Sequence, residues 1–277
     1  MRNTILFAIL CAFALLVGCG GKSDADEDQV MVKTQRLKGD SMVYGLACEG
    51  CTDSVVVLLP EDGSDPVTYN IIEAMRQGKV LGKLQIGDRI ALVLNKNNKH
   101  VADEVVDIDR LEGIWCYIVM PKLRDFSTMS NKQQARIMEN MSDSMKETFL
   151  IPREYGFYLK PEWEMNSVGY VAEVNSLADE SPVIYPELGY YTNWHLWNGK
   201  VIFTSGTPQI TKDNQLKVTN IHYDTCSIDY LGADSLVLSG DGISRSYYRK
   251  NDLNDINKKA KAISAMRSKE ALEQTKQ

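Results

Sequence analysis

Short runs of strand-forming residues recur along most of this chain and restrict it to a β architecture. From Ser41 to Lys250, Val, Ile, Leu, Thr and aromatic residues gather in runs of roughly four to eight residues, and clusters of Gly, Pro, Asp and Asn separate them. Roughly 240 residues follow position 40, which is enough for two domains that each have their own core. We therefore predict a mainly β protein with two small antiparallel barrels.

The first group of predicted strands occupies residues 41–110. A short helical piece at Ile71–Gln77 lies between its third and fourth strands. This order resembles an OB-type barrel, a fold associated with oligonucleotide or oligosaccharide binding, although a fold does not determine function. We expect an OB-like β-barrel domain whose five strands are Ser41–Ala47, Ser54–Leu59, Val67–Tyr69, Gly87–Leu94 and Val101–Val106.

Cys48 and Cys51 form a CxxC pair within this first group. Such a pair can be a redox centre, half of a zinc site or a small structural disulfide. A thioredoxin-like centre needs a helix after the first cysteine, whereas a strand-forming run follows Cys51. Zinc needs two more ligands, and Cys116 and Cys226 lie in the next domain. A structural turn or a Cys48–Cys51 disulfide is therefore favoured, and the pairing of the four cysteines stays open.

The second group of predicted strands occupies residues 111–250. Gly113 and Trp115 form a Gly-x-Trp that opens its first strand, and about eight strand segments follow. This arrangement resembles lipocalins and the lipocalin-like domains of bacterial lipoproteins. The resemblance implies a lipocalin-like β-barrel in which an arginine of the last strand, here Arg245 or Arg249, packs over Trp115 and closes the barrel.

An eight-stranded barrel either fills its interior with side chains or holds one small ligand. Residues that would line a ligand are inward apolar and aromatic ones. The alternative is that the same residues only fill the core. The candidates for ligand lining are Tyr158, Trp194, Leu196, Phe203 and Tyr223.

Two helical segments interrupt or follow these strands. Ser130 and Gln133 form a capping-box pattern, and the run up to Pro152 has apolar residues at helical spacing. This methionine-rich face could be a mobile lid or, more commonly, a face packed on its own domain. Residues 251–277 are expected to form a C-terminal helix that packs at its start. The apolar residues of the two segments are Met138, Met141, Met145 and Phe149, and then Leu253, Ile256, Ala260 and Ile263.

The first 18 residues have the pattern of a secretory signal. Arg2 is positive, and Ile5–Val17 is an apolar run of about thirteen residues, too short to span a bilayer as a helix. The run ends in Leu16-Val17-Gly18-Cys19, which resembles the lipobox of bacterial lipoproteins. The resemblance implies that residues 1–18 are a lipoprotein signal peptide, and that Cys19 receives diacylglycerol and an acyl chain such as palmitate, which anchors the chain in a membrane.

Residues 19–40 are rich in Gly, Lys and Asp and cannot bury enough apolar surface to fold alone. We expect a flexible acidic tether. Its segment Lys22–Asp28 resembles acidic segments that direct lipoproteins to the outer face of the outer membrane in one phylum of gut-dwelling Gram-negative bacteria. A plain solvated linker is the alternative, so the predicted location is the outer membrane, on its periplasmic or its cell-surface face.

The motifs of common enzymes are missing from the sequence. It contains no Gly-x-Ser-x-Gly elbow, P-loop, dinucleotide fingerprint or His-Glu-x-x-His, so we predict a non-enzymatic protein without metal or cofactor. A net charge of −6 argues against nucleic acid as a partner, because phosphate binding needs clustered Lys and Arg. Two functions remain: a carrier or sensor of a small apolar or amphipathic ligand, and an envelope module that binds a protein partner and has filled barrels.

Overall fold

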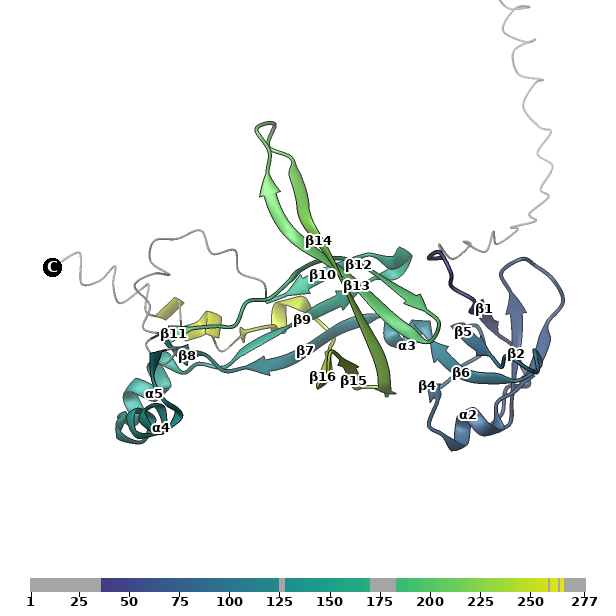
Figure 1. Cartoon of the computed structure of the whole chain (residues 1–277), viewed down its shortest axis with the longest axis horizontal. Coiled ribbons are helices and arrows are strands. Elements are labelled where there is room, and N and C mark those ends of the chain that lie inside the picture. The colour runs from purple at the N-terminus through teal and green to yellow at the C-terminus, as the bar shows by residue number, and fades with distance from the viewer. Residues whose placement is uncertain (1–35, 125–127, 170–182, 259, 264, 267–277) are drawn as a thin grey trace, which may run out of the picture. The chain divides into compact units, whose positions relative to one another are not determined.

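The computed structural model describes residues 36–124, 128–169, 183–258, 260–263 and 265–266 (Figure 1). All described residues belong to one compact unit of the chain. The predicted signal peptide, Cys19 and most of the predicted tether lie outside the described residues. None of the helices in the described ranges has the length and apolar character that crossing a membrane requires.

Six strands of the N-terminal half form one sheet that curls into a small barrel-like structure. Its order is β3-β2-β1-β5-β6-β4, and all pairs are antiparallel except β4 with β6. A parallel bridge between Asn70 and Val101 joins the end of β3 to the start of β6. The strands are β1 Val43–Ala47, β2 Val55–Pro60, β3 Val67–Asn70, β4 Val80–Leu81, β5 Arg89–Leu94 and β6 Ala102–Asp107.

Alternating side chains of these strands build the core of the first sheet. Val56 and Leu58 of β2 and Ile90 and Leu92 of β5 are fully buried, since side chains two positions apart in a strand share a face. Helix α2 (Ile72–Arg76) follows β3, at the position predicted for a short helical piece, and packs on the same core.

Eight strands of the C-terminal half form a second, antiparallel sheet (Figure 1). Its order, β10-β9-β7-β16-β15-β14-β13-β12, is a meander in which the last strand, β16, returns to pair with the first, β7. The strands are β7 Gly113–Val119, β9 Arg153–Leu159, β10 Met165–Val168, β12 Tyr190–Trp197, β13 Lys200–Ile210, β14 Leu216–Leu231, β15 Ser235–Gly240 and β16 Ile243–Lys250.

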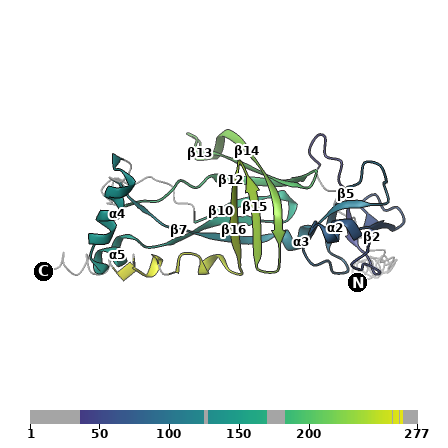
Figure 2. The same ribbon diagram turned by 60° about the horizontal axis from the view of Figure 1, so that its bottom comes forward.

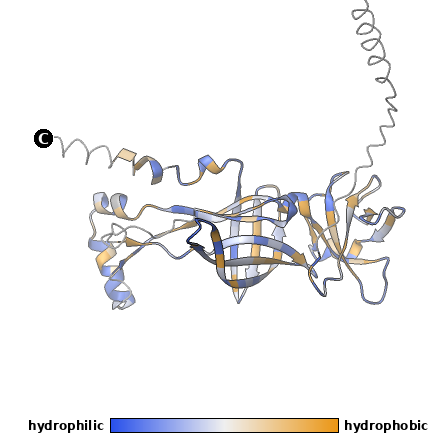
Figure 3. Ribbon diagram, turned by 90° about the horizontal axis from the view of Figure 1, so that it is seen from above, coloured by the Kyte–Doolittle hydropathy of each residue, from blue (hydrophilic) through white to orange (hydrophobic). Residues whose placement is uncertain are grey.

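The edge strands β10 and β12 meet and nearly close this sheet into a barrel. Glu164 and Asn193 form an antiparallel bridge. Ser167 Oγ donates to the carbonyl of Gly189 at 2.6 Å and accepts the N–H of Tyr191 at 2.7 Å. The strands carry both hydrophobic and hydrophilic residues (Figure 3). The prediction of a mainly β fold with two small barrels is thus confirmed as a nearly closed eight-stranded barrel and a smaller barrel-like sheet.

Two helices, α4 (Asn131–Asn140) and α5 (Asp143–Phe149), form the predicted helical insertion between β7 and β9. Ser130 caps α4, because its Oγ accepts the N–H of Gln133 while the Gln133 side chain accepts the N–H of Ser130. None of the α4 residues is buried. Beside them, β8 (Lys122–Leu123) pairs with β11 (Val183–Ile184).

The start of the C-terminal segment packs on the outer face of the barrel. Figure 2 shows this segment, in yellow, running alongside β7. After the turn η3 (Leu253–Asp255), Ile256 is 4% exposed and packs with Ile114, Cys116 and Val168. Helical residues begin at 258, so the described part of the predicted tail packs before its helix starts.

The two sheets share part of their cores. Helix α3 (Ile108–Leu111) joins β6 to β7, and its end residues are buried in one cluster with Tyr44 of β1 and with Trp115 and Trp194 of the barrel. A short helix that links two sheets and buries side chains in both cores couples their packing.

Polar contacts surround this shared core. Asp40 accepts the Tyr44 hydroxyl at 2.7 Å and the N–H of Asn198 at 3.2 Å. The Asn198 side chain accepts the N–H of Ser41 at 3.0 Å and donates to the carbonyl of Gly39 at 3.2 Å. Asn198 lies in the Asn198-Gly199 turn between β12 and β13, and its φ of +48° fits a type I′ turn, in which both central residues have a positive φ.

Candidate functional site

Arg249 closes one end of the eight-stranded barrel. Its guanidinium carbon lies 4.2 Å from the ring centroid of Trp115. The guanidinium also donates to the backbone carbonyls of Ala233 at 2.8 Å, of Glu112 at 2.7 Å and of Arg110. Burial and the nearby Arg110 charge lower the pKa of Arg249. Side chains therefore close this end of the barrel, and backbone carbonyl groups hold the Arg249 guanidinium in place.

Gly113 makes room for this arginine. Its φ is +131°, and a Cβ at this position would collide with Nη1 of Arg249. Of the two arginines considered from the sequence, the structure places Arg249 against the Gly-x-Trp segment. Arg245 lies farther along the barrel, with its guanidinium carbon 4.3 Å from the ring centroid of Tyr117.

Side chains fill the middle of the barrel. Of the predicted ligand-lining residues, Trp194, Leu196 and Phe203 point inward and are 0%, 2% and 4% exposed. The ring centroid of Phe157 lies 4.9 Å from that of Phe203 and 5.0 Å from that of Tyr247. These contacts belong to a packed core, so any ligand in this region would have to sit above the aromatic layer.

Tyr158 and Tyr223 do not point into the barrel, so the prediction that they line its interior is wrong. On β14, Asp224 pairs with the inward Phe203 position, and Tyr223 lies on the outer face with 66% exposure. On β9, Tyr158 packs in the outer cluster that contains Ile256. Successive side chains of a strand point to opposite faces of the sheet. In each case, therefore, the residue next to the predicted one points into the barrel.

The exposed end of the barrel carries four residues that we call the tyrosine–arginine cluster: Tyr117, Tyr191, Tyr247 and Arg245. The Tyr117 and Tyr247 rings meet edge to face with centroids 5.5 Å apart, and Arg245 lies over Tyr117. Tyr191 enters from β12 and contacts Phe157 at 6.3 Å between ring centroids. Strands β7, β12 and β16 therefore bring a cation and three phenols together.

Burial raises the pKa of all three tyrosines of the cluster. The pKa of Tyr247 rises to about 12, although the hydrogen bond and charge of Arg245 act in the opposite direction. Asp224 is a carboxylate whose charge acts on Tyr191, and its Oδ1 lies 2.9 Å from Nε2 of His222. At neutral pH the cluster therefore presents neutral phenol donors beside one permanent cation.

The hydroxyls of Tyr117 and Tyr191 make no hydrogen bond with any residue that the structure describes. Both residues are half-buried, so their hydroxyls are partly removed from bulk water. Half-buried polar groups without a protein partner are favourable contact points for water or a ligand. No local pattern in the sequence predicts this cluster, because its members lie on three strands that are far apart in the chain.

The four cysteines of the described ranges, Cys48, Cys51, Cys116 and Cys226, are free thiols. The candidate Cys48–Cys51 disulfide is therefore not formed here, and the Cys51 sulfur accepts the N–H of Val57 at 3.3 Å instead. Burial raises the pKa of Cys116 to about 12. Within the same ranges, no three His, Cys, Asp or Glu side chains are grouped as a metal site would need.

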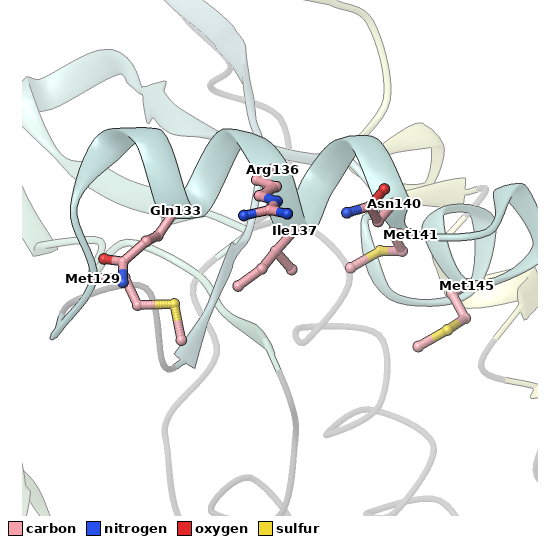
Figure 4. A pocket seen from close by; sticks show the side chains of 7 residues that line it. All are labelled: Met129, Gln133, Arg136, Ile137, Asn140, Met141 and Met145. Carbon is pink, nitrogen blue, oxygen red and sulfur yellow. The ribbon is translucent and has the colours of Figure 1, made fainter.

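The methionine-rich helices line a groove of about 570 Å³ (Figure 4). Met141 and Met145 contribute to it as predicted from helical spacing, whereas Met138 does not line it. Ile137 and Met145 are 36% and 48% exposed, so this face is not packed into a core. The packed-face interpretation is therefore not supported by the described residues, and the lid interpretation stays a prediction.

Comparisons with known proteins add one structural likeness. No protein-family model and no curated protein matches the chain. Among solved structures, the chain is similar to a lipocalin-like protein from Bacteroides thetaiotaomicron, with 17% sequence identity over 50% of this chain and 95% of that protein and a TM-score of 0.26. A likeness of this size carries no conclusion about function.

Proposed function

We propose that this chain is a lipid-anchored cell-envelope lipoprotein whose lipocalin-like C-terminal barrel holds a small amphipathic ligand at the tyrosine–arginine cluster. One observation carries the ligand proposal: Arg245 converges above a packed aromatic core with the hydroxyls of Tyr117 and Tyr191, which have no partner among the described residues. A few convergent polar groups inside an otherwise apolar enclosure are typical of sites that orient a small ligand.

The cluster suggests which end of the ligand lies where. Arg245 is exposed at the rim and remains cationic, so it favours an anionic or strongly polar end there. The rings of Phe157 and Phe203 form the floor, which favours an apolar portion above them. Because this floor is filled, the ligand is small and sits near the end of the barrel.

The envelope setting is supported by the N-terminal sequence. The apolar run ending at Cys19 supports signal cleavage, lipidation at that cysteine and attachment to the outer membrane. The acidic composition and missing catalytic motifs support a non-enzymatic role without nucleic acid. For the first sheet, we propose an OB-like barrel, which its strand order and the parallel bridge from Asn70 to Val101 support.

Native mass spectrometry of the gently extracted full chain tests the ligand proposal. We expect a bound small molecule in the wild type and its loss in Arg245→Gln, since the variant removes the cation at the rim. Arg76→Gln is the matched control, because Arg76 is an exposed arginine on α2. A ligand-free mass together with a stable protein partner would instead support an envelope interaction module with filled barrels.

Lipidation needs a separate test. Globomycin treatment or Cys19→Ala is expected to change the apparent size of the protein and release it from the membrane fraction. Unchanged size and fractionation would contradict the lipid anchor without bearing on the ligand site.

A further inference from the structure

A second pocket lies outside the barrel, between its outer wall and the C-terminal segment. Its volume is about 410 Å³, which is in the range of small-molecule sites. Tyr158 and Val168 of strands β9 and β10 belong to one wall. The other wall consists of Leu253, Ile256, Asn257 and Lys261. Tyr158 and Val168 belong to the outer cluster around Ile256, and no member of the tyrosine–arginine cluster is among the described residues that line this pocket.

Reciprocal hydrogen bonds fix the two walls against each other. The N–H of Glu154 donates to Asn257 Oδ1 at 2.6 Å, and Asn257 Nδ2 donates back to the Glu154 carbonyl at 3.0 Å. The N–H of Asn257 also donates to Glu154 Oε2 at 2.7 Å. With Ile256 buried beside them, these bonds hold the C-terminal segment in one position. These bonds therefore hold the two walls of the pocket at a fixed separation.

Positive charge gathers in this pocket although the chain as a whole is acidic. Lys160 and Lys261 approach from opposite walls, and none of the described residues that line the pocket is an Asp or a Glu. Lys160 has an exposed ion pair with Glu164 at 3.5 Å, a contact of little energetic weight. Lys261 has no ion pair with any described residue. In a chain of net charge −6, two such ammonium groups around an apolar pocket favour an anion.

We propose that this pocket binds a small organic anion with an apolar body, such as an alkyl phosphate or an alkyl carboxylate. The ammonium groups of Lys160 and Lys261 hold the anionic head, and the amide of Asn166 adds a donor. Tyr158 and Ile256 contact the apolar body. This site does not depend on the ligand proposed for the barrel. The head group can belong to a free molecule or to a membrane lipid.

Calorimetric titration of the purified full chain with hexyl phosphate tests the proposal. We expect saturable binding that weakens about tenfold in Lys160→Gln/Lys261→Gln, since two ion contacts are lost. Lys212→Gln/Lys217→Gln removes the same charge from the far end of the β13–β14 hairpin and should leave the affinity unchanged. Inorganic phosphate should bind more weakly than hexyl phosphate, because it lacks the apolar body.

Two further measurements identify the site and the source of the head group. Arg245→Gln should leave hexyl phosphate binding intact; loss of binding in that variant alone would assign it to the barrel and overturn the proposal. Equal weakening by both lysine pairs, or no saturable binding, would also overturn it. Lysine-dependent co-sedimentation with anionic but not zwitterionic vesicles would show that the head group belongs to a lipid. If the chain binds hexyl phosphate but does not co-sediment with the vesicles, the head group belongs to a free molecule.

Discussion

Asp107 is a buried carboxyl group at the end of β6, with 1% exposure. Its Oδ1 caps α3 by accepting the N–H of Arg110 at 2.8 Å, while Oδ2 has no partner among the described residues. Burial raises its pKa to about 6, against the lowering effect of the Arg110 bond. Between about pH 4 and pH 6 the folded chain therefore binds a proton that the unfolded chain releases, and this group makes stability fall as the pH rises.

Asp107→Asn tests this account at the same position. The amide oxygen can still cap α3, but it does not titrate, so we expect the variant to be more stable than wild type at pH 7 by roughly 1–3 kcal/mol. Its stability should also fall less steeply from pH 4 to pH 6. Asp107→Ala is the control, since it loses the cap, which costs about 1 kcal/mol. Urea unfolding at several pH values measures both; an unchanged pH slope in Asp107→Asn would contradict the assignment.

Gly113 permits a second residue-scale test, because its backbone angle and its contact with Arg249 can be separated. Gly63 also has a positive φ, of +77°, but a Cβ there would meet nothing within 4 Å. Gly63→Ala should therefore cost only the strain of its backbone, about 1 kcal/mol. Gly113→Ala should cost more, about 3 kcal/mol, because the methyl group also displaces the Arg249 guanidinium. Equal losses in denaturant unfolding would show that the arginine contact contributes nothing.

At the scale of elements, the C-terminal segment shields part of the outer barrel wall. Ile256 covers Cys116, whose thiol is fully buried and has a pKa raised to about 12. Ile256→Ala should lower the unfolding free energy by about 2–4 kcal/mol and speed alkylation of Cys116, because the cavity loosens the segment. Leu253→Ala is the control, since Leu253 is 48% exposed. Mass spectrometry of alkylated peptides measures the rate; no difference between the variants would contradict this shielding.

The sequence predicted the elements better than it predicted the directions of side chains. The Asn198-Gly199 turn, the capping box of α4 and the strand runs could be predicted because each depends on neighbouring residues. The direction of the Tyr223 side chain could not be predicted, because the exposed end of the barrel is polar and Asp224 takes the inward position there. A rule based on hydrophobicity predicts that the tyrosine points into such a barrel and the aspartate points out, which is the reverse of what the structure shows.

The candidate site was harder to predict for a similar reason. The sequence offers both Arg245 and Arg249 as partners of Trp115, and only the register of β16 against β7 places Arg249 at that position. Tyr117 and Tyr191 meet across strands that the chain reaches far apart. The register between strands that are far apart in the chain depends on the whole sheet, so no local run of residues predicts it.

At the scale of the whole molecule, the shared core predicts that the two sheets unfold together. Leu111 is fully buried in the cluster that joins Tyr44 of the first sheet to Trp194 of the barrel. Hydrogen exchange in increasing denaturant, followed by mass spectrometry, should show peptides of both sheets losing protection at one midpoint. Leu111→Ala should lower both midpoints together, with a loss of about 2–5 kcal/mol. If residues 41–110 and 111–250 behave as independent domains, their peptides will instead lose protection at separate midpoints, and Leu111→Ala will shift them unequally.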